Sequence, residues 1–289
     1  MIAVVLLIVP SVKWTSGLST EHPNIGSVLG PTIRPLIDGD LAGIEASTDQ
    51  PARCGSSDAC RIGRWTKTMT QSLTRVGAWL ADSRAGRLTA LIIITALGVW
   101  ITPAGILLIF IWKFLTKTKM KELGFWRPRS WVKTIAFGIV LGVFLKLIFK
   151  SLVIPLVGVE SSGGTFDFLE GNLSAALGFG LFVIFSAGFG EELVYRGYFF
   201  SRVAQMFGST RTIKVSTVLL GSLIFGIPHI YQGVNGAIQA TLMGVIIGVM
   251  YFKNHGNLWL LIVMHACFDL FAIYLIYSDL DSQVARWFF

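Results

Sequence analysis

The segment FSAGFGEELVYRGYFF, from Phe185 to Phe200, places two adjacent carboxylates and an arginine inside an otherwise apolar run. On an α-helix, Glu192 and Arg196 lie four residues apart and face each other, so an internal ion pair would neutralise both charges. Glu191 points about 100° away from Glu192 on such a helix and has no partner of this kind in sequence. A lone carboxylate at membrane depth costs at least about 2.5 kcal/mol, so we expect Glu191 to face a wet cavity or other polar groups.

Two later apolar segments supply candidate polar groups. LIFGIPHI places Phe225 and His229 four residues apart, and IVMHACFD places His265 and Asp269 four apart on one helical face. Pro228 breaks helical bonding just before His229, which membrane helices tolerate chiefly where a cavity or a neighbour satisfies the freed carbonyls. One such histidine alone would more often be a packing residue. A carboxylate beside imidazoles in a secluded wet pocket, however, can take a proton from water and stabilise an oxyanion, which indicates a hydrolase.

The composition places these segments in a membrane. Of the 289 residues, 53% are hydrophobic and 14% are charged, with a mean hydropathy of +0.68, whereas soluble domains carry about 25% charged residues. Apolar windows of spanning length lie near 90–114, 135–158, 173–190, 215–231, 236–252 and 257–277. We therefore expect an all-α fold: a polytopic membrane helix bundle of about six or more transmembrane helices around a polar intramembrane site.

The distribution of charge predicts the orientation of the chain. The linker KFLTKTKMKELGFWRPRSWVK, from Lys113 to Lys133, carries seven basic residues against a lone Glu122 and is expected to face the cytoplasm. The opposite side should carry Glu160, Asp167 and Glu170, and the next cytoplasmic turn Arg202, Arg211 and Lys214. Three arginines break this alternation if residues 90–114 cross once: Arg75, Arg84 and Arg87. Alternatively, Pro103 breaks residues 90–114 into a hairpin of two helices. The net charge of +8 is explained by topology or anionic lipid, and a nucleic-acid partner is not expected.

The N-terminal part differs from the rest. Residues 1–87 are polar and lack sustained periodicity, so we expect a poorly ordered extension before a membrane-embedded domain over 88–289. The first ten residues are too short to span and no basic segment precedes them, so a signal peptide is not favoured. Alternatively, translation begins at Met69, and the residues before it come from a start codon assigned too far upstream. Cys54 and Cys60 would be able to close a small loop in an exported segment, whereas Cys267 lies in an apolar helix.

The three motifs, EExxxR in EELVYR, FxxxH ending at His229 and HxxxD from His265 to Asp269, resemble those of the CAAX prenyl protease and bacteriocin-processing family. LGFWRPRSW, from Leu123 to Trp131, is similar to the linker that such proteins carry before their core, and the resemblance covers about residues 90–278. It implies that Glu191 is the general base that activates water, with His229 beside it. His265 and Asp269 would bind the oxyanion or complete a metal site. The supporting residues would be Glu192, Arg196 and Phe225.

One position departs from the family pattern. Many relatives have Asn where this chain has Asp269, and an ionised carboxylate cannot donate a hydrogen bond to an oxyanion. Asp269 would therefore be protonated, orient His265 or ligate a metal. The set Glu191, His229, His265 and Asp269 is also plausible for Zn²⁺, and the resemblance fits a metal-free glutamate mechanism as well as a metalloprotease.

The implied function is that of an intramembrane endopeptidase of the CAAX type. Its partners would be the lipid bilayer and a membrane-associated peptide or protein substrate, prenylated or bacteriocin-like. It would be a multi-pass protein of a bacterial-type inner (cytoplasmic) membrane. Two alternatives stay open: a catalytically silent immunity or scaffold protein of the same fold, and a proton-coupled transporter. The small-xxx-small pairs Gly138 with Gly142 and Gly244 with Gly248 are expected to pack helices within the chain.

Overall fold

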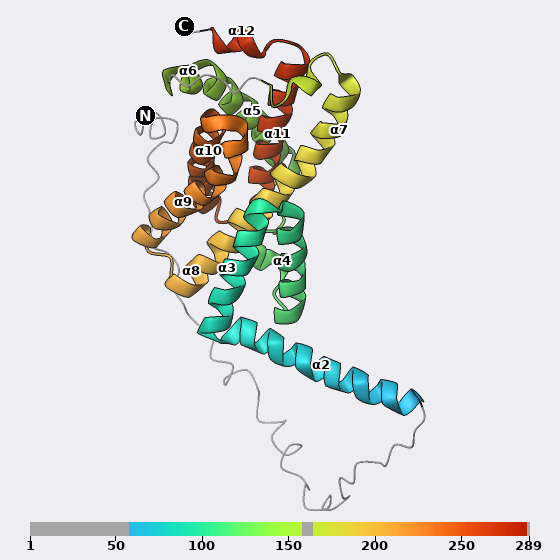
Figure 1. Ribbon diagram of the computed structural model, residues 1–289. Helices are drawn as coiled ribbons and strands as arrows, with labels where there is room; N and C mark the ends of the chain where they lie inside the picture. Colours follow the sequence, from blue (N-terminus) through green and yellow to red (C-terminus); the bar gives the residue numbers. More distant parts are fainter. Residues whose placement is uncertain (1–57, 158–163, 288–289) are drawn as a thin grey trace, which may run out of the picture. The chain divides into compact units, whose positions relative to one another are not determined.

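The computed structural model describes residues 58–157 and 164–287 (Figure 1). Within these ranges all regular structure is helical, which confirms the expected all-α class. The chain divides into two compact units, Met1–Met69 and Thr70–Phe289, and the candidate site lies entirely in the second. Residues 58–87, which we expected to lack regular structure, form α2 (Asp58–Asp82) and the start of α3 (Arg84–Trp100). The possible bridge between Cys54 and Cys60 and the position of Glu160 lie outside the described residues, because Cys54 and residue 160 are not among them.

The helices that can cross a membrane are fewer than expected. By length and composition, the described residues contain four candidate spans, Trp131–Val157, Leu173–Phe207, Arg211–Lys253 and Leu258–Tyr277, or five if the bent pair of α2 and α3 is one span. The expected six or more are not confirmed. A hydropathy window detects apolar length but does not detect where a helix turns back, and the candidate span Arg211–Lys253 itself contains two helices that fold back on each other.

The first apolar window is a hairpin of two short helices. α3 has 17 residues and α4 (Thr102–Thr116) has 15, so they are only about 25 Å and 22 Å long, less than the ~30 Å hydrocarbon core. The break falls at Ile101, and Pro103 stands in the first turn of α4, where its missing N–H costs nothing. α3 and α4 pack against each other and against η6 (Ile184–Phe200), and Gly98 lies against Val194 of η6. The tip of the hairpin therefore reaches the depth of the two glutamates.

The other spans form a tight bundle around η6. α5 (Trp131–Ile148) continues through η4 (Phe149–Val153) and α6 (Ile154–Val157), and it packs along α11 (Leu258–Tyr277). α7 (Leu173–Val183), η6 and α8 (Ser201–Phe207) make one continuous span. α9 (Arg211–Gly226) ends in η7 (Ile227–Gln232), and α10 (Gly233–Lys253) folds back along α9.

Small residues permit the close helix contacts, as expected from their spacing. A side chain added at Gly138 would meet Val263 of α11, and one added at Gly142 would meet the backbone of Met264. Gly244 faces Ser222 in the same way, and Gly248 faces Val218 and Phe200. These glycines let α5 approach α11 and let α10 approach α9.

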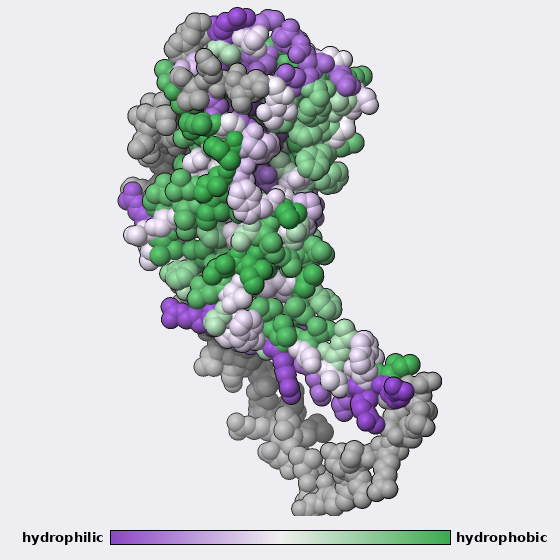
Figure 2. Space-filling view, in the orientation of Figure 1, coloured by the Kyte–Doolittle hydropathy of each residue, from purple (hydrophilic) through white to green (hydrophobic). Residues whose placement is uncertain are grey.

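The two ends of the bundle carry opposite charge. At one end the linker with η3 (Met120–Leu123) is hydrogen-bonded to the turn before α11, because Leu258 N–H donates to Gly124 O over 3.1 Å. The basic residues of this end are Arg84, Arg87, Lys113, Lys117, Lys119, Lys121, Arg127, Arg129, Lys133, Arg211, Lys214 and Lys253. The other end contains η5 (Asp167–Leu169) and α12 (Asp281–Ala285), and its acidic residues are Asp167, Glu170, Asp279 and Asp281. Apolar side chains cover the surface between the ends (Figure 2).

Because α3 and α4 form a hairpin, Arg84 and Arg87 return to the end that carries the basic linker. The alternative of a broken hairpin at Pro103 is therefore the one that the structure adopts. A single crossing by residues 90–114 would have put these arginines on the opposite side, against the rule that Lys and Arg gather in the cytoplasm.

We expect the basic end to face the cytoplasm. In an otherwise cysteine-free chain, cysteines at Ser130 and Ser209 should resist an impermeant thiol reagent in intact cells, whereas a cysteine at Ser282 in α12 should react. Permeabilised cells provide the control, since all three positions should then be labelled. Labelling of Ser130→Cys or Ser209→Cys from outside would reverse this topology.

Candidate active site

The two adjacent glutamates lie in different surroundings. Glu192 is fully buried, and its Oε1 accepts a hydrogen bond from Arg196 Nη1 over 3.0 Å and one from His265 Nδ1 over 2.8 Å. The expected pair of Glu192 with Arg196 is therefore present. Arg196 Nη2 also donates to the carbonyl of Gly244 on α10 over 3.3 Å. The contact with His265 was not expected, since the sequence pattern assigned the histidines to Glu191.

The segment that carries both glutamates is not an ordinary α-helix. η6 is π-helical over 17 residues, so its backbone bonds run from i to i+5 and its turns are wider than those of an α-helix. π-Helical turns are rare and occur frequently at functional sites. Glu192 points into the protein from this segment, while Glu191 keeps 17% of its side chain exposed and lines a cavity.

The ring of Phe225 packs against residues of the other two motifs and against His229 of its own motif. Its ring is 1% exposed and lies 5.0 Å from the ring of His229 and 5.8 Å from the ring of His265, centroid to centroid. The Arg196 guanidinium stacks 4.8 Å from the same ring, a cation–π contact. The aromatic residue of FxxxH thus packs between the residues of all three motifs and limits the movement of both imidazoles.

His229 is oriented by its own helix end. α9 stops at Gly226, and η7 follows because Pro228 has no N–H to continue the α-helical ladder. The His229 Nδ1–H donates to the carbonyl of Phe225 over 2.8 Å. A carbonyl only accepts, so Nδ1 is the protonated nitrogen in this contact, and Nε2 is left for a group in the cavity.

A second polar cluster surrounds His265 Nε2. This atom lies 3.9 Å from Glu191 Oε2 and 3.6 Å from Asp269 Oδ2. Both separations exceed direct hydrogen-bonding distance and suit a bridging water or substrate group. Glu191 Oε2 is itself buried and has no hydrogen-bond partner among residues 58–157 and 164–287. This oxygen is therefore placed to accept a hydrogen bond from a group that enters the cavity.

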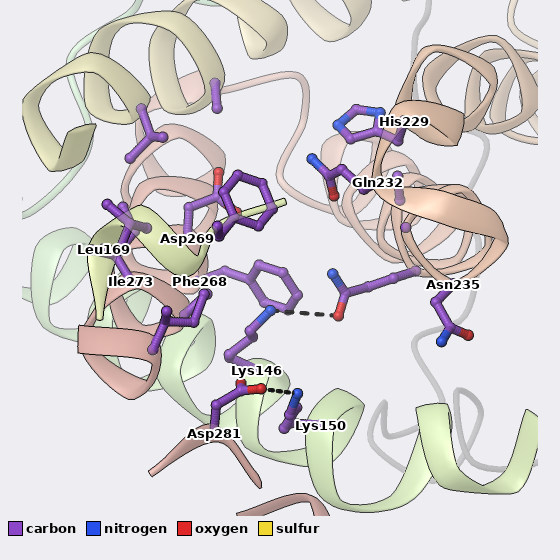
Figure 3. Close-up of a pocket in the computed structure, with 18 of the residues that line it drawn as sticks. Lys146, Lys150, Leu169, His229, Gln232, Asn235, Phe268, Asp269, Ile273 and Asp281 are labelled. Carbon is purple, nitrogen blue, oxygen red and sulfur yellow. Dashed lines mark hydrogen bonds and ion pairs between the residues drawn. The ribbon is translucent and has the colours of Figure 1, made fainter. Parts of the chain in front are cut away.

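All four residues named from the sequence line one cavity of about 430 Å³: Glu191, His229, His265 and Asp269. His229 projects from η7 and Asp269 from α11, on opposite walls (Figure 3). Asp167, Glu170, Asp279 and Asp281 also line this cavity, so it lies toward the acidic end of the bundle. The fold thus brings together in space the four residues that the sequence pattern predicted.

The cavity also contains polar residues that the sequence motifs did not single out. Lys146 of α5 and Gln239 of α10 lie in its wall, and Lys150 forms an ion pair with Asp281 at its edge (Figure 3). The only signal for Lys146 was a lone lysine in an apolar window. Such lysines usually reach past a helix end to water, but Lys146 is only 7% exposed.

The donor geometry does not match a metal site. In the part of the chain that the structure describes, no three side chains of His, Cys, Asp or Glu converge as metal ligands would. The Nδ1 atoms of both histidines are engaged by Glu192 and by the Phe225 carbonyl. Engagement of Nδ1 leaves both Nε2 atoms available, as in metal-bound histidines. The possible Zn²⁺ set of Glu191, His229, His265 and Asp269 therefore shares a cavity, with its donors apart from one another among the described residues.

Comparison with known families agrees with the three motifs. Residues 173–271 match the family model of the type II CAAX prenyl endopeptidase Rce1-like proteins. The similarity to that family is thus shown over these residues of the chain. The Rce1-like region contains η6, α9, η7 and most of α11, and hence every residue of the three motifs. No curated protein and no solved structure gives a significant match to the chain. The Rce1-like region is thus a multi-pass membrane domain of a protease family.

The Glu192 contacts predict a large effect on stability. Glu192→Gln should leave Arg196 without a counter-charge, and breaking a buried pair from one side lowers the free energy of unfolding by about 3–5 kcal/mol. We expect a clear drop in the melting temperature in detergent, with partial recovery in Glu192→Gln/Arg196→Met. Glu191→Gln is the matched control and should melt near the wild type. A Glu192→Gln protein as stable as the wild type would refute this assignment.

Proposed function

We propose that the chain is an intramembrane endopeptidase that hydrolyses a peptide bond of a membrane-associated substrate, with Glu191 as the general base. The observation that carries this proposal is the environment of Glu191. Glu191 lines the cavity, and its Oε2 lies beside His265 without a hydrogen-bond partner among the described residues. Glu192 does not line the cavity, and its Oε1 accepts hydrogen bonds from Arg196 and His265. The match of residues 173–271 to a protease family supports the same reaction class.

The proposed reaction needs one water and one peptide bond. Glu191 takes a proton from the water, and the water oxygen attacks the carbonyl carbon of the substrate. This gives a tetrahedral intermediate with a negatively charged oxygen. The carbon–nitrogen bond then breaks, and the proton passes from Glu191 to the leaving amine. The products are a carboxylic acid and an amine, so the atoms balance and Glu191 is regenerated.

The imidazoles would stabilise the intermediate. His229 keeps Nε2 for the cavity because its Nδ1–H is bound to Phe225 O. A proton on that Nε2 during the reaction would allow it to donate to the oxyanion. His265 is held by Glu192 at Nδ1, so its Nε2 stays between Glu191 and Asp269. Asp269 would then orient His265, a role that requires no hydrogen bond from Asp269 to the oxyanion.

The position of the cavity supports entry from the acidic end. If the basic end faces the cytoplasm, a substrate reaches Glu191 from the opposite side of the membrane. An exported, bacteriocin-like peptide would suit this route better than a prenylated protein that stays in the cytoplasm. A cytoplasmic membrane of bacterial type is part of this proposal.

Two other functions remain as outcomes of the experiments. A silent immunity or scaffold protein would keep the fold without hydrolysis. One observation favours a proton-coupled transporter: the π-helical segment η6 carries ionisable residues within its span. Neither alternative requires Glu191 to act on water.

Replacement of the proposed base should abolish hydrolysis without unfolding the protein. Glu191→Gln should slow cleavage by about 10²-fold or more at an unchanged melting temperature, because the amide cannot accept the proton. Substrates are found by comparing membrane-protein fragments from cells with wild-type protein and cells with Glu191→Gln, and rates are then measured with purified protein. Glu170→Gln, at the rim of the cavity, is the matched control and should cleave normally.

Double variants test whether the groups act together. Adding His265→Ala to Glu191→Gln should cost little more than Glu191→Gln alone, since members of one catalytic unit are not additive. Normal cleavage by Glu191→Gln would refute its role as base. Identical fragments in both kinds of cell would favour the silent or transport alternatives.

We propose that hydrolysis needs no metal, because the described donors do not converge on one point. Purified protein treated with a strong chelator and then dialysed should cleave at the untreated rate. A zinc protease treated in parallel provides the positive control for chelation. Loss of cleavage that returns when Zn²⁺ is added would instead assign the shared cavity to a metalloprotease.

A further inference from the structure

Lys146 is a buried cation in the cavity wall that the proposed hydrolysis does not use. It comes from the last turn of α5, is 7% exposed, and lines the same cavity as Glu191 and Asp269. A buried ammonium is costly unless it is paired and hydrogen-bonded. The contacts of Lys146 therefore indicate which kind of group binds its ammonium.

The contacts of Lys146 are weak for a buried charge. Its Nζ lies 3.5 Å from Gln239 Oε1, at the limit of a hydrogen bond, and 4.7 Å from the centroid of the Phe268 ring. No carboxylate of the described residues forms an ion pair with it. Lys150, one turn further along the chain, is paired with Asp281 (Figure 3). Of these two neighbouring lysines, only Lys150 has its charge balanced by a close partner.

We propose that Lys146 and Gln239 form a subsite for a carboxylate of the substrate peptide. The inference rests on the proposed function, because it places a second anchor in the cavity that contains Glu191. An ammonium has three donors and Gln239 takes one of them, so two remain for carboxylate oxygens. The Gln239 amide would also donate its own N–H after a rotation of the amide group. Phe268 would pack against the peptide beside the charge.

A carboxylate of this kind has two sources in a peptide: the free C-terminus or an acidic side chain. The Lys146 subsite would fix the peptide at one point and leave an upstream peptide bond to Glu191. It would determine specificity through binding, and Lys146 would take no part in the chemical step.

The test is equilibrium binding to the full chain that carries Glu191→Gln, so that no probe is cleaved. The probes are fluorescent apolar peptides that end in a serine, with a free carboxylate or a C-terminal amide. A third probe has the amide and a glutamate in place of the serine. Fluorescence anisotropy in detergent gives the Kd of each.

The free acid should bind about 10-fold or more tightly than the amide, as expected for hydrogen bonds to a charged group. Lys146→Met should abolish this preference and leave the amide's Kd unchanged, and Lys146→Arg should retain it. Lys150→Met is the matched control, since Lys150 is already paired with Asp281, and it should keep the preference. Tighter binding of the glutamate probe than of the serine amide would identify a side-chain carboxylate as the source.

Equal affinity for all three probes, no binding of any probe, or a preference that survives Lys146→Met would overturn the subsite. The proposed hydrolysis can fail separately. A preference for the acid that depends on Lys146, together with wild-type protein that cleaves no peptide, would keep the subsite and reject the protease.

Discussion

The buried carboxylate of Glu192, shared by Arg196 and His265, is the interaction on which the site depends. A charge inside a membrane domain must be paired, and Glu192 and Arg196 are almost completely buried. Arg196 extends the pair to the Gly244 carbonyl on α10 and to the Phe225 ring on α9, while His265 connects it to α11. One ion pair therefore ties together the helices that surround the cavity. Because it occupies His265 Nδ1, it also fixes which nitrogen of that ring faces Glu191 and Asp269.

This arrangement gives two neighbouring glutamates different tasks. Glu192 binds Arg196 and His265 through its Oε1 inside the protein, whereas Glu191 lines the cavity and keeps an oxygen without a hydrogen-bond partner among the described residues. A site with both carboxylates committed to arginine and histidine would have no base. A site with neither committed would leave Arg196 buried without its counter-charge. The two glutamates lie in the π-helical turns of η6, and the hairpin of α3 and α4 packs against this segment.

The sequence predicted the groups of the site better than their contacts. The ion pair at spacing four, the apolar helices and the cavity-lining role of His229, His265 and Asp269 follow from periodicity and from the cost of charge in lipid. The hydrogen bond of Glu192 to His265 joins residues 73 positions apart, and no local pattern reports such a contact. The π-helix was missed because its residues also suit an α-helix. The expected number of spans is not confirmed, because hydropathy does not distinguish a crossing from a hairpin. Lys146 was missed because a lone lysine in an apolar window usually reaches water.

The central claim, that Glu191 activates water directly, is tested most directly by cleavage in heavy-oxygen water under single-turnover conditions. Mass spectrometry then follows the label in the new carboxylate of the product and in the segment of the chain that contains Glu191. A general base predicts one heavy oxygen in the first product and none in Glu191, because water attacks the substrate itself. Label in Glu191 together with an unlabelled first product would mean that this carboxylate attacks the substrate as a nucleophile, and it would contradict the account.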